Sequence, residues 1–371
     1  MKLLDRRLPR GLGGGEVAFL RSLGAPSRFR PVYEQRFSGL GERQAIEEGL
    51  RIYESALGAP ETMQESLFMR SISYFLHALA ANPDAEEAHQ ALANSLFAIQ
   101  LSRARAEGCR GVGEPFFLRA LAPRSQGVGV LLIHDFGAKP GQMRDLASYL
   151  NDSGYTTYGL RLPGHGQPLH TLAYSSARQW FEAAEEGVWL LKESATNVVT
   201  LGQGVGGILA LLLAAHLREV GGVVSLAAPV RMKARWITLM PLLEPFIKYR
   251  FQKLYNEHSE VYHRYMPTSA IAAMGDLIRH YTDHLARVTC PVMLLQSRLD
   301  DFSNPLKSPK IIQSSIHSST CRIRYVGQKY VLAEKNPDQE EINDLIADFI
   351  NEITGLQGSP AARRRQTHHE A

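Results

Sequence analysis

Apolar residues change their spacing along the chain at about residue 115. From about residue 42 to residue 107 they recur at helical intervals, as in Leu67, Ile72, Phe75 and Leu76. This spacing places apolar side chains on one face of a helix, where they can pack against a neighbour. We therefore predict at least three helices in this segment.

One helix junction in this segment has a recognisable pattern. The stretch HALAANPDAEEAHQALANSLFA resembles a tetratricopeptide-repeat junction, with Pro83 between the two helices. A stable solenoid needs about three stacked repeats, and a single junction is visible. We expect a helical extension that packs on the rest of the protein, with a peptide-binding array as the alternative.

After residue 115, short apolar runs alternate with helical stretches. Strands are predicted at 116–121, 129–134, 156–160, 198–202, 222–226, 292–296 and 321–326, and helices at 141–152, 176–193, 205–218 and 338–354. Alternation of this kind predicts an α/β fold with a doubly wound sheet. Uninterrupted apolar runs such as VLLI suit a mainly parallel sheet that is covered on both faces.

The pattern divides the chain into four parts. Residues 1–28 are expected to form a flexible lead-in, 29–110 the helical extension, 111–356 the α/β domain and 357–371 a basic flexible tail. Between about 230 and 287 the strand and helix alternation stops, and aromatic residues such as Trp236, Phe246 and Tyr255 accumulate. We expect a small helical cap there, with these aromatic side chains in its core. The alternative is that they line an apolar pocket for a small-molecule ligand under the cap.

Composition narrows the functional classes. The chain of 371 residues is 44% hydrophobic and 21% charged with a formal charge of +4, which is typical of a soluble globular protein. Basic clusters lie at both ends without interleaved aromatic residues, so no nucleic-acid partner is expected. The uncharged stretch 198–217 is interrupted by glycines, and no membrane span is predicted.

The cysteines and the first residues of the chain indicate the cellular compartment, and the cysteine spacing shows whether a metal site is expected. Cys109, Cys290 and Cys321 are an odd, widely spaced set, which fits a reducing compartment and no metal site. The first residues show no export signal. We expect a cytoplasmic protein without a metal or another cofactor.

Five motifs occur in a familiar order: LLIHDFGAKPGQM, SYLNDSGYTTYGLRLPGHG, LGQGVGG, SLAAPV and PVMLLQSRLDDFSNP. From residue 127 to about 352 the chain resembles the bacterial carboxylesterase and monoacylglycerol-lipase branch of the α/β-hydrolases. The resemblance implies the α/β-hydrolase fold. It also implies a site in which a serine on a sharp strand-to-helix turn works with a histidine and an acid.

Two of the three catalytic positions depart from that pattern. Gly204 stands at the centre of the G-x-S-x-G motif, where relatives carry the nucleophilic serine. Tyr330, to within one residue, stands where the histidine is expected, and no histidine lies between His317 and His368. The resemblance places the acid at Asp300, in preference to Asp301. The sequence thus predicts a degenerate triad.

The resemblance also places the oxyanion-hole amides at Phe136 and Val205. Asp135 follows His134 where relatives carry a glycine. An inward carboxylate there would oppose oxyanion stabilisation, and we expect the side chain to point outward, as an ordinary turn residue.

Three histidines lie in loops at the carboxyl ends of strands, the edge at which α/β sheets bind ligands. They are His134, His165 and His170. We expect them to support the loops. The alternative is that one of them acts as a replacement base for water.

The segment Gly202–Gly207 also fits G-x-G-x-x-G, a dinucleotide-binding pattern. An acidic residue would normally end the next strand to bind the ribose, and this chain has Ser225 to Pro229 there. Nucleotide or anion binding at this turn is therefore a minor alternative.

These observations favour a catalytically inactive hydrolase homologue. It would bind an apolar ligand under the cap, or a protein partner through the helical extension. The alternative is an active hydrolase of a carboxylic ester or acylglycerol-like substrate, with a rearranged site that uses no serine.

Overall fold

The computed structural model describes residues 39–121, 124, 127–230, 247–251, 260–327, 331–332 and 338–355. Four sequence-based expectations concern, wholly or in part, residues outside these ranges: the lead-in, the basic tail, residues 231–246 and 252–259 of the cap, and the place of Tyr330. Among the described residues, no helix is both long and apolar enough to span a membrane.

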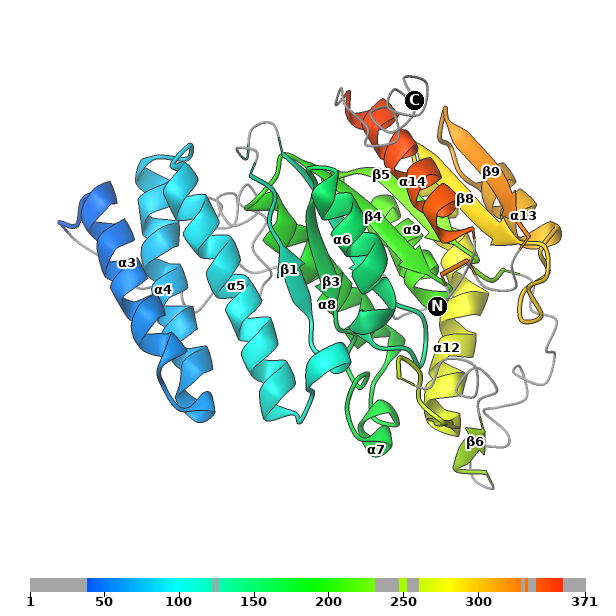
Figure 1. Cartoon of the computed structure of the whole chain (residues 1–371), viewed down its shortest axis with the longest axis horizontal. Helices are drawn as coiled ribbons and strands as arrows, with labels where there is room; N and C mark the ends of the chain where they lie inside the picture. Colours follow the sequence, from blue (N-terminus) through cyan, green and yellow to red (C-terminus); the bar gives the residue numbers. More distant parts are fainter. Residues whose placement is uncertain are drawn as a thin grey trace, which may run out of the picture.

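Three helices form the N-terminal extension. They are α3 (Glu42–Leu57), α4 (Glu61–Ala81) and α5 (Glu86–Ala106), and they lie side by side at one end of the molecule (Figure 1). Their facing apolar side chains make a separate core that includes Ile46, Phe68, Phe75, Leu79 and Leu92. The helical spacing of these residues is what buries them together.

The extension is packed against the α/β domain through α5. The ring of Phe97 on this helix lies 5.7 Å from Phe117 and 6.2 Å from Tyr158, both in the sheet. His89 Nδ1 lies 2.6 Å from Glu193 Oε2, and both side chains are buried. The junction therefore has the aromatic packing and the buried polar contact of a protein interior.

The α/β domain contains a seven-stranded sheet of order β1-β3-β2-β4-β5-β8-β9. The strands are β1 (Phe116–Leu118), β2 (Val128–Ile133), β3 (Thr156–Leu160), β4 (Asn197–Gln203), β5 (Val220–Leu226), β8 (Val292–Ser297) and β9 (Cys321–Val326). Strand β1 pairs antiparallel with β3, and the other pairs are parallel. The predicted fold class, a doubly wound and mainly parallel sheet, is confirmed.

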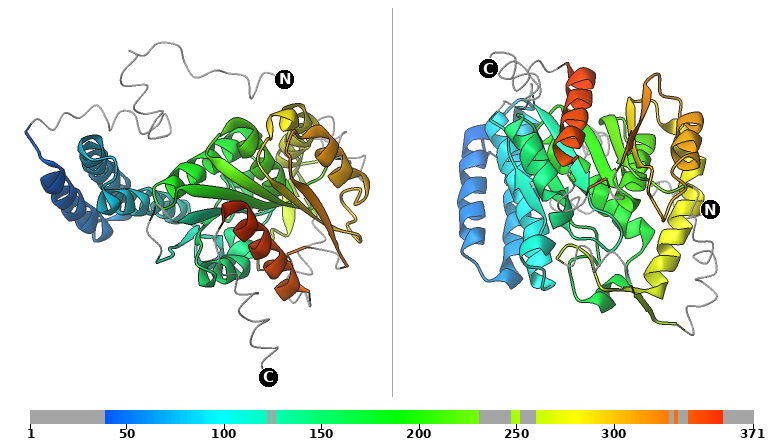
Figure 2. Two further views of the ribbon diagram at one scale, coloured as in Figure 1. Left: turned by 90° about the horizontal axis from the view of Figure 1, so that it is seen from above. Right: turned by 45° about the vertical axis from the view of Figure 1, so that its right-hand side comes forward.

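Helices cover both faces of the sheet (Figures 1 and 2). Helices α6 (Arg144–Asp152) and α14 (Gln339–Thr354) pack on one face. Helices α8 (Ala177–Lys192) and α9 (Val205–His216) pack on the other. Helix α12 (Thr268–His280) packs against α8 and α9.

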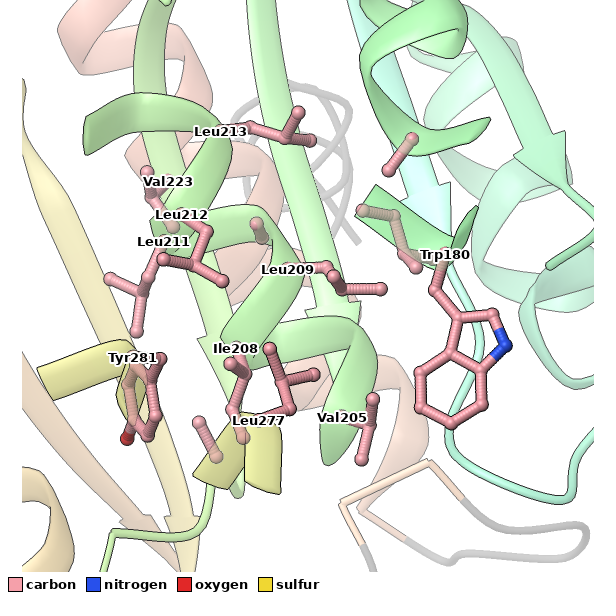
Figure 3. Close-up of a cluster of buried hydrophobic side chains, with 14 of the residues drawn as sticks. Trp180, Val205, Ile208, Leu209, Leu211, Leu212, Leu213, Val223, Leu277 and Tyr281 are labelled. Carbon is pink, nitrogen blue, oxygen red and sulfur yellow. The ribbon is translucent and has the colours of Figure 1, made fainter. Parts of the chain in front are cut away.

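Helix α9 is the most deeply buried of these helices. Its side chains Ile208, Leu209 and Leu212 lie among Trp180 and Tyr281 from neighbouring elements (Figure 3). Such packing leaves little freedom for the helix to shift. The N-terminus of α9 is therefore a fixed point in the fold.

Smaller elements complete the description. The helices α7 (Leu169–Leu172) and α13 (Lys307–Ser315) and three 3-10 turns, η2 (Gly111–Gly113), η4 (Pro140–Met143) and η6 (Tyr281–Arg287), lie in connections. Strands β6 (Tyr249–Phe251) and β7 (Tyr265–Pro267) form an antiparallel pair.

The cap expected at 230–287 is only partly described. Helix α12 lies within these limits, yet its residues Ala270, Ile271 and Met274 are buried in the same core as α8 and α9. This helix therefore packs against the helices of the α/β domain. The 230–287 boundary of the cap stays a prediction.

Candidate active site

The chain reverses sharply at Gly204. Strand β4 ends at Gln203 and α9 begins at Val205, and Gly204 between them has φ +55° and ψ −114°. Glycine adopts positive φ without the steric penalty that a Cβ introduces. Gly204 thus lies on the strand-to-helix turn where the sequence predicted the nucleophile position.

The neighbouring glycines allow the strand and helix to approach closely. A Cβ on Gly206 would lie 2.1 Å from the carbonyl oxygen of Ile133 on β2. A Cβ on Gly202 would lie 2.2 Å from the carbonyl carbon of Gly206. A Cβ on Gly207 would lie 3.0 Å from the carbonyl oxygen of Gly202. Close packing of strand and helix therefore accounts for Gly202 and Gly207 of the G-x-G-x-x-G pattern.

The Asp135 carboxylate occupies the space beside Gly204. Asp135 follows β2, and its Oδ1 accepts hydrogen bonds from the backbone N–H of Phe136 (2.7 Å) and of Val205 (3.0 Å). A Cβ on Gly204 would lie 2.0 Å from this Oδ1 and 2.4 Å from Cγ. The carboxylate thus fills the volume that a side chain at position 204 would need.

The expectation that Asp135 points outward is therefore wrong. Two backbone N–H groups converge at this turn, and one of them opens helix α9, where the helix dipole favours a negative charge. The two amides predicted to form the oxyanion hole, those of Phe136 and Val205, both bind a carboxylate from the protein's own chain.

Burial raises the pKa of Asp135 to about 6, and the charge of Asp300 adds to this rise. The hydrogen bonds from the N–H groups of Val205 and Phe136 act in the opposite direction. The carboxylate is therefore mostly ionised at neutral pH. Asp135, Phe136 and Gly204 are each partly exposed, so solvent reaches the turn.

Asp300 follows β8 and is buried. Its Oδ1 accepts hydrogen bonds from the N–H groups of Phe302 (2.8 Å) and Ser303 (3.0 Å), and its Oδ2 accepts one from Gln296 Nε2 (2.9 Å). Burial raises the pKa of Asp300, and these hydrogen bonds oppose the rise. Asp301 is exposed, so Asp300 is the carboxylate that faces the interior.

His134 links two loops of the site. Its Nδ1 donates to the Asp135 carbonyl oxygen at 2.8 Å, and its Nε2 accepts from the Leu162 N–H at 3.2 Å. One donor and one acceptor match a neutral imidazole. Burial lowers the pKa of His134 to about 4, so it stays neutral at physiological pH. Both nitrogens are engaged in holding the loops after β2 and β3.

His165 is buried beside Phe136 and Trp180, with ring centroids 5.9 Å and 5.8 Å away. Its Nδ1 donates to the Pro163 carbonyl oxygen at 3.1 Å, and its Nε2 has no hydrogen-bond partner within the described part of the chain. Burial lowers its pKa well below the usual range. His170 is exposed and takes no part in this cluster.

Sequence reasoning missed Gln142 and His263. Gln142 Oε1 accepts from the Asp135 N–H at 2.8 Å, and its Nε2 donates to the Tyr262 hydroxyl. The backbone N–H of His263 donates to the Gly137 carbonyl oxygen at 2.9 Å. Burial of the His263 imidazole, with a contribution from the charge of Lys139, lowers its pKa to about 4. Gln142 sits in the same motif as Asp135, which was the available signal; His263 lies in the cap stretch and had none.

The loop after β9 reaches the turn as well. The Leu332 N–H donates to the buried Gln203 Oε1 at 2.9 Å, which holds this loop beside Gly204. Tyr330, two residues earlier, lies outside the described residues. Within the described ranges, no group of three or more potential metal ligands occurs.

Comparison with known families identifies the domain. Residues 125–330 match the family described as serine aminopeptidase, S33, also called Hydrolase_4. The chain belongs to this family. The matched residues contain Asp135, Gly204 and Asp300, whereas the three helices of the extension lie before them.

Curated relatives of this S33 family member include a lipase and an esterase. The thermostable monoacylglycerol lipase of Bacillus sp. (strain H-257) is 29% identical over 231 residues, which are 62% of this chain and 92% of the relative. The carboxylesterase of Bacillus subtilis (strain 168) is 22% identical over 231 residues, 60% of this chain and 92% of the relative.

Solved structures share the fold of this family member. The structure described as LipS and LipT, two metagenome-derived lipolytic enzymes, has a TM-score of 0.60 at 24% identity, covering 66% of this chain and 99% of that one. The Paleococcus ferrophilus monoacylglycerol lipase has a TM-score of 0.53 at 16% identity, covering 64% and 98%. These matches show the α/β-hydrolase fold.

Proposed function

We propose that this family member is inactive as a serine esterase or lipase, and that it binds a ligand at the turn around Gly204. The observation that carries the proposal is the Asp135 carboxylate, whose Oδ1 accepts from both the Phe136 and Val205 N–H groups. An ester carbonyl would have to displace a charged acceptor to reach them. Hydrogen bonds to an ionised acceptor are about twice as strong as those to a neutral one.

The absent hydroxyl at Gly204 supports the same conclusion. A serine nucleophile at that position would need both a side chain and a base. The space for the side chain is occupied by Asp135, and Tyr330 is our proposal for the residue at the histidine's place.

The alternative of an active ester hydrolase with a histidine base for water has less support. Both ring nitrogens of His134 are hydrogen bonded, and His165 is fully buried against Phe136 and Trp180. Neither imidazole offers a water molecule an accessible lone pair. External anion binding at the turn is disfavoured as well, since the amides that would bind the anion already bind Asp135.

A protein partner on the extension has less support than a ligand at the turn. The apolar side chains of α3, α4 and α5 pack mainly on each other and on the sheet. Leu57 and Met63 are the large apolar side chains of the described extension that are mostly exposed. We therefore place the ligand at the carboxyl edge of the sheet, where Asp135, Phe136 and Gly204 are partly exposed.

A fluorophosphonate probe and short-chain nitrophenyl esters test the inactive assignment. We expect neither covalent labelling nor ester turnover above that of the heat-denatured protein, because no activated serine is present at the turn. The Bacillus monoacylglycerol lipase serves as the positive control. Labelling of this chain that maps to a serine, with matching ester turnover, would overturn the proposal.

A further inference from the structure

The described site contains one acyl group whose oxygen lies between the two amides. That group is the side chain of Asp135: Oδ1 is held by the Phe136 and Val205 N–H groups, and Cγ lies beside Gly204. In acyl transfer, such amides stabilise negative charge on the oxygen of the carbon under attack. The carbon placed for attack here is therefore Cγ of Asp135.

We propose that Asp135 is a catalytic nucleophile that forms an ester with an electrophilic sp3 carbon, such as that of an epoxide or an alkyl halide. This goes beyond the proposed function and rests on one part of it, the absence of a serine nucleophile. Asp135 Oδ2 makes the bond to carbon, while the carbon–oxygen bond of the epoxide or the carbon–halogen bond breaks. The bonding electrons leave on the alkoxide, which takes a proton from solvent water, or on the halide.

The second step returns the carboxylate. Hydroxide from solvent attacks Cγ of the Asp135 ester, so the step requires no imidazole base, and the negative charge that develops on Oδ1 falls between the Phe136 and Val205 N–H groups that already bind this atom. The bond from Cγ to the ester oxygen then breaks. The departing alkoxide takes the proton of the attacking hydroxide, so the released product is an alcohol, and the oxygen of that hydroxide stays in the Asp135 carboxylate.

The arrangement selects this substrate class over carboxylic esters. Displacement at an sp3 carbon creates no oxyanion on the substrate in its first step, so it needs no empty amide pair. Oδ1 is fixed while the side chain as a whole is partly exposed, which leaves Oδ2 as the oxygen that can attack. The nearby Asp300 carboxylate disfavours anionic substrates, because like charges repel.

Mass spectrometry tests the nucleophile directly. The full-length protein is incubated with a phenyl-substituted epoxide and with a short bromoalkane in oxygen-18 water, then digested and mapped. We expect either an alkyl adduct on the peptide that contains Asp135 or oxygen-18 in the Asp135 carboxylate. Absence of both with both electrophiles would overturn the proposal.

Two variants make the assignment specific. Asp135→Asn keeps an oxygen that accepts from both amides and removes the anionic nucleophile, so adduct and isotope should both be lost. Asp145→Asn changes an exposed carboxylate at the start of α6 and should retain the adduct or isotope at Asp135. Equal labelling of Asp135→Asn and the unchanged protein would contradict the role of Asp135. Fluorophosphonate labelling of a serine would contradict the proposed function. The absence of any label at Asp135 would contradict the proposed nucleophile, so the two failures can be told apart.

Discussion

The substitution Gly204→Ser is expected to lower the free energy of unfolding by about 4 kcal/mol, the larger of the effects predicted here. Backbone strain at φ +55° contributes on the order of 2 kcal/mol. Overpacking contributes a similar amount, because the new Cβ would lie 2.0 Å from Asp135 Oδ1 and the carboxylate must move off its two amides. Urea unfolding monitored by circular dichroism measures the loss.

A matched control separates strain from the clash. Gly154 also has positive φ (+94°), but a Cβ there would meet nothing within 4 Å. Gly154→Ser should therefore cost only about 2 kcal/mol. In the Asp135→Gly background, Gly204→Ser should fall to the same cost. If Gly204→Ser costs no more than Gly154→Ser in the unchanged protein, Asp135 does not fill the space beside Gly204.

The contact between Asp135 and a side chain at position 204 also determines which substitutions would be needed to create ester hydrolysis. Gly204→Ser alone should leave nitrophenyl esters unhydrolysed, since the serine lacks a base and the amides remain bound to Asp135. Adding Tyr330→His supplies the base, and adding Asp135→Gly frees the amides. Measurable turnover is expected only from the triple variant. Turnover by Gly204→Ser alone would show that the proposed place of Tyr330 is wrong.

Asp135→Asn is expected to stabilise the protein at neutral pH by about 2 kcal/mol. Burial holds the pKa of Asp135 at about 6 against an ordinary value of 3.8, so ionisation opposes folding. A rise of this size corresponds to about 3 kcal/mol at full burial, and solvent screening at a partly exposed carboxylate reduces it. Asparagine has no such charge and retains an acceptor for the two amides.

The stability gain from Asp135→Asn is expected to depend on pH. Between about pH 4 and pH 6 the folded protein binds more protons at Asp135 than the unfolded chain does, so this residue's contribution to stability falls as the pH rises. The gain from Asp135→Asn should therefore be small near pH 4, grow to about pH 6 and stay constant above. Because His134 makes stability rise over the same window in both proteins, the difference between them is the quantity to measure. A gain that is constant from pH 4 upward would contradict the raised pKa.

The central strand positions were predictable because β2, β4, β5 and β8 contain short apolar runs. The exception is β1, expected to reach residue 121 and ending at Leu118: the Ala120 N–H donates to the Thr156 hydroxyl, and the chain leaves the ladder. Helices α7 and α13 were missed, since both are short and carry few apolar residues.

The site was predictable in part. Resemblance to the α/β-hydrolases placed Gly204 on the correct turn, and burial distinguishes Asp300 from Asp301. The direction of Asp135 was not predictable, because one of the N–H groups that binds it belongs to Val205, 70 residues away in the chain. From its neighbours in the sequence, Asp135 is expected to be a turn residue with a free carboxylate. In the folded protein two backbone N–H groups lie within hydrogen-bond distance of that carboxylate.

The way α5 meets the sheet limits how modular this protein is. Phe97 packs between Phe117 on the edge strand β1 and Tyr158 on β3, and the buried His89 reaches Glu193 at the end of α8. A cut near residue 110, which the sequence suggests as a boundary, would expose aromatic rings at a sheet edge and leave a buried carboxylate without its partner. Fusing this α/β unit to another protein, or exchanging it with a relative that lacks the helices, therefore requires redesign of that surface.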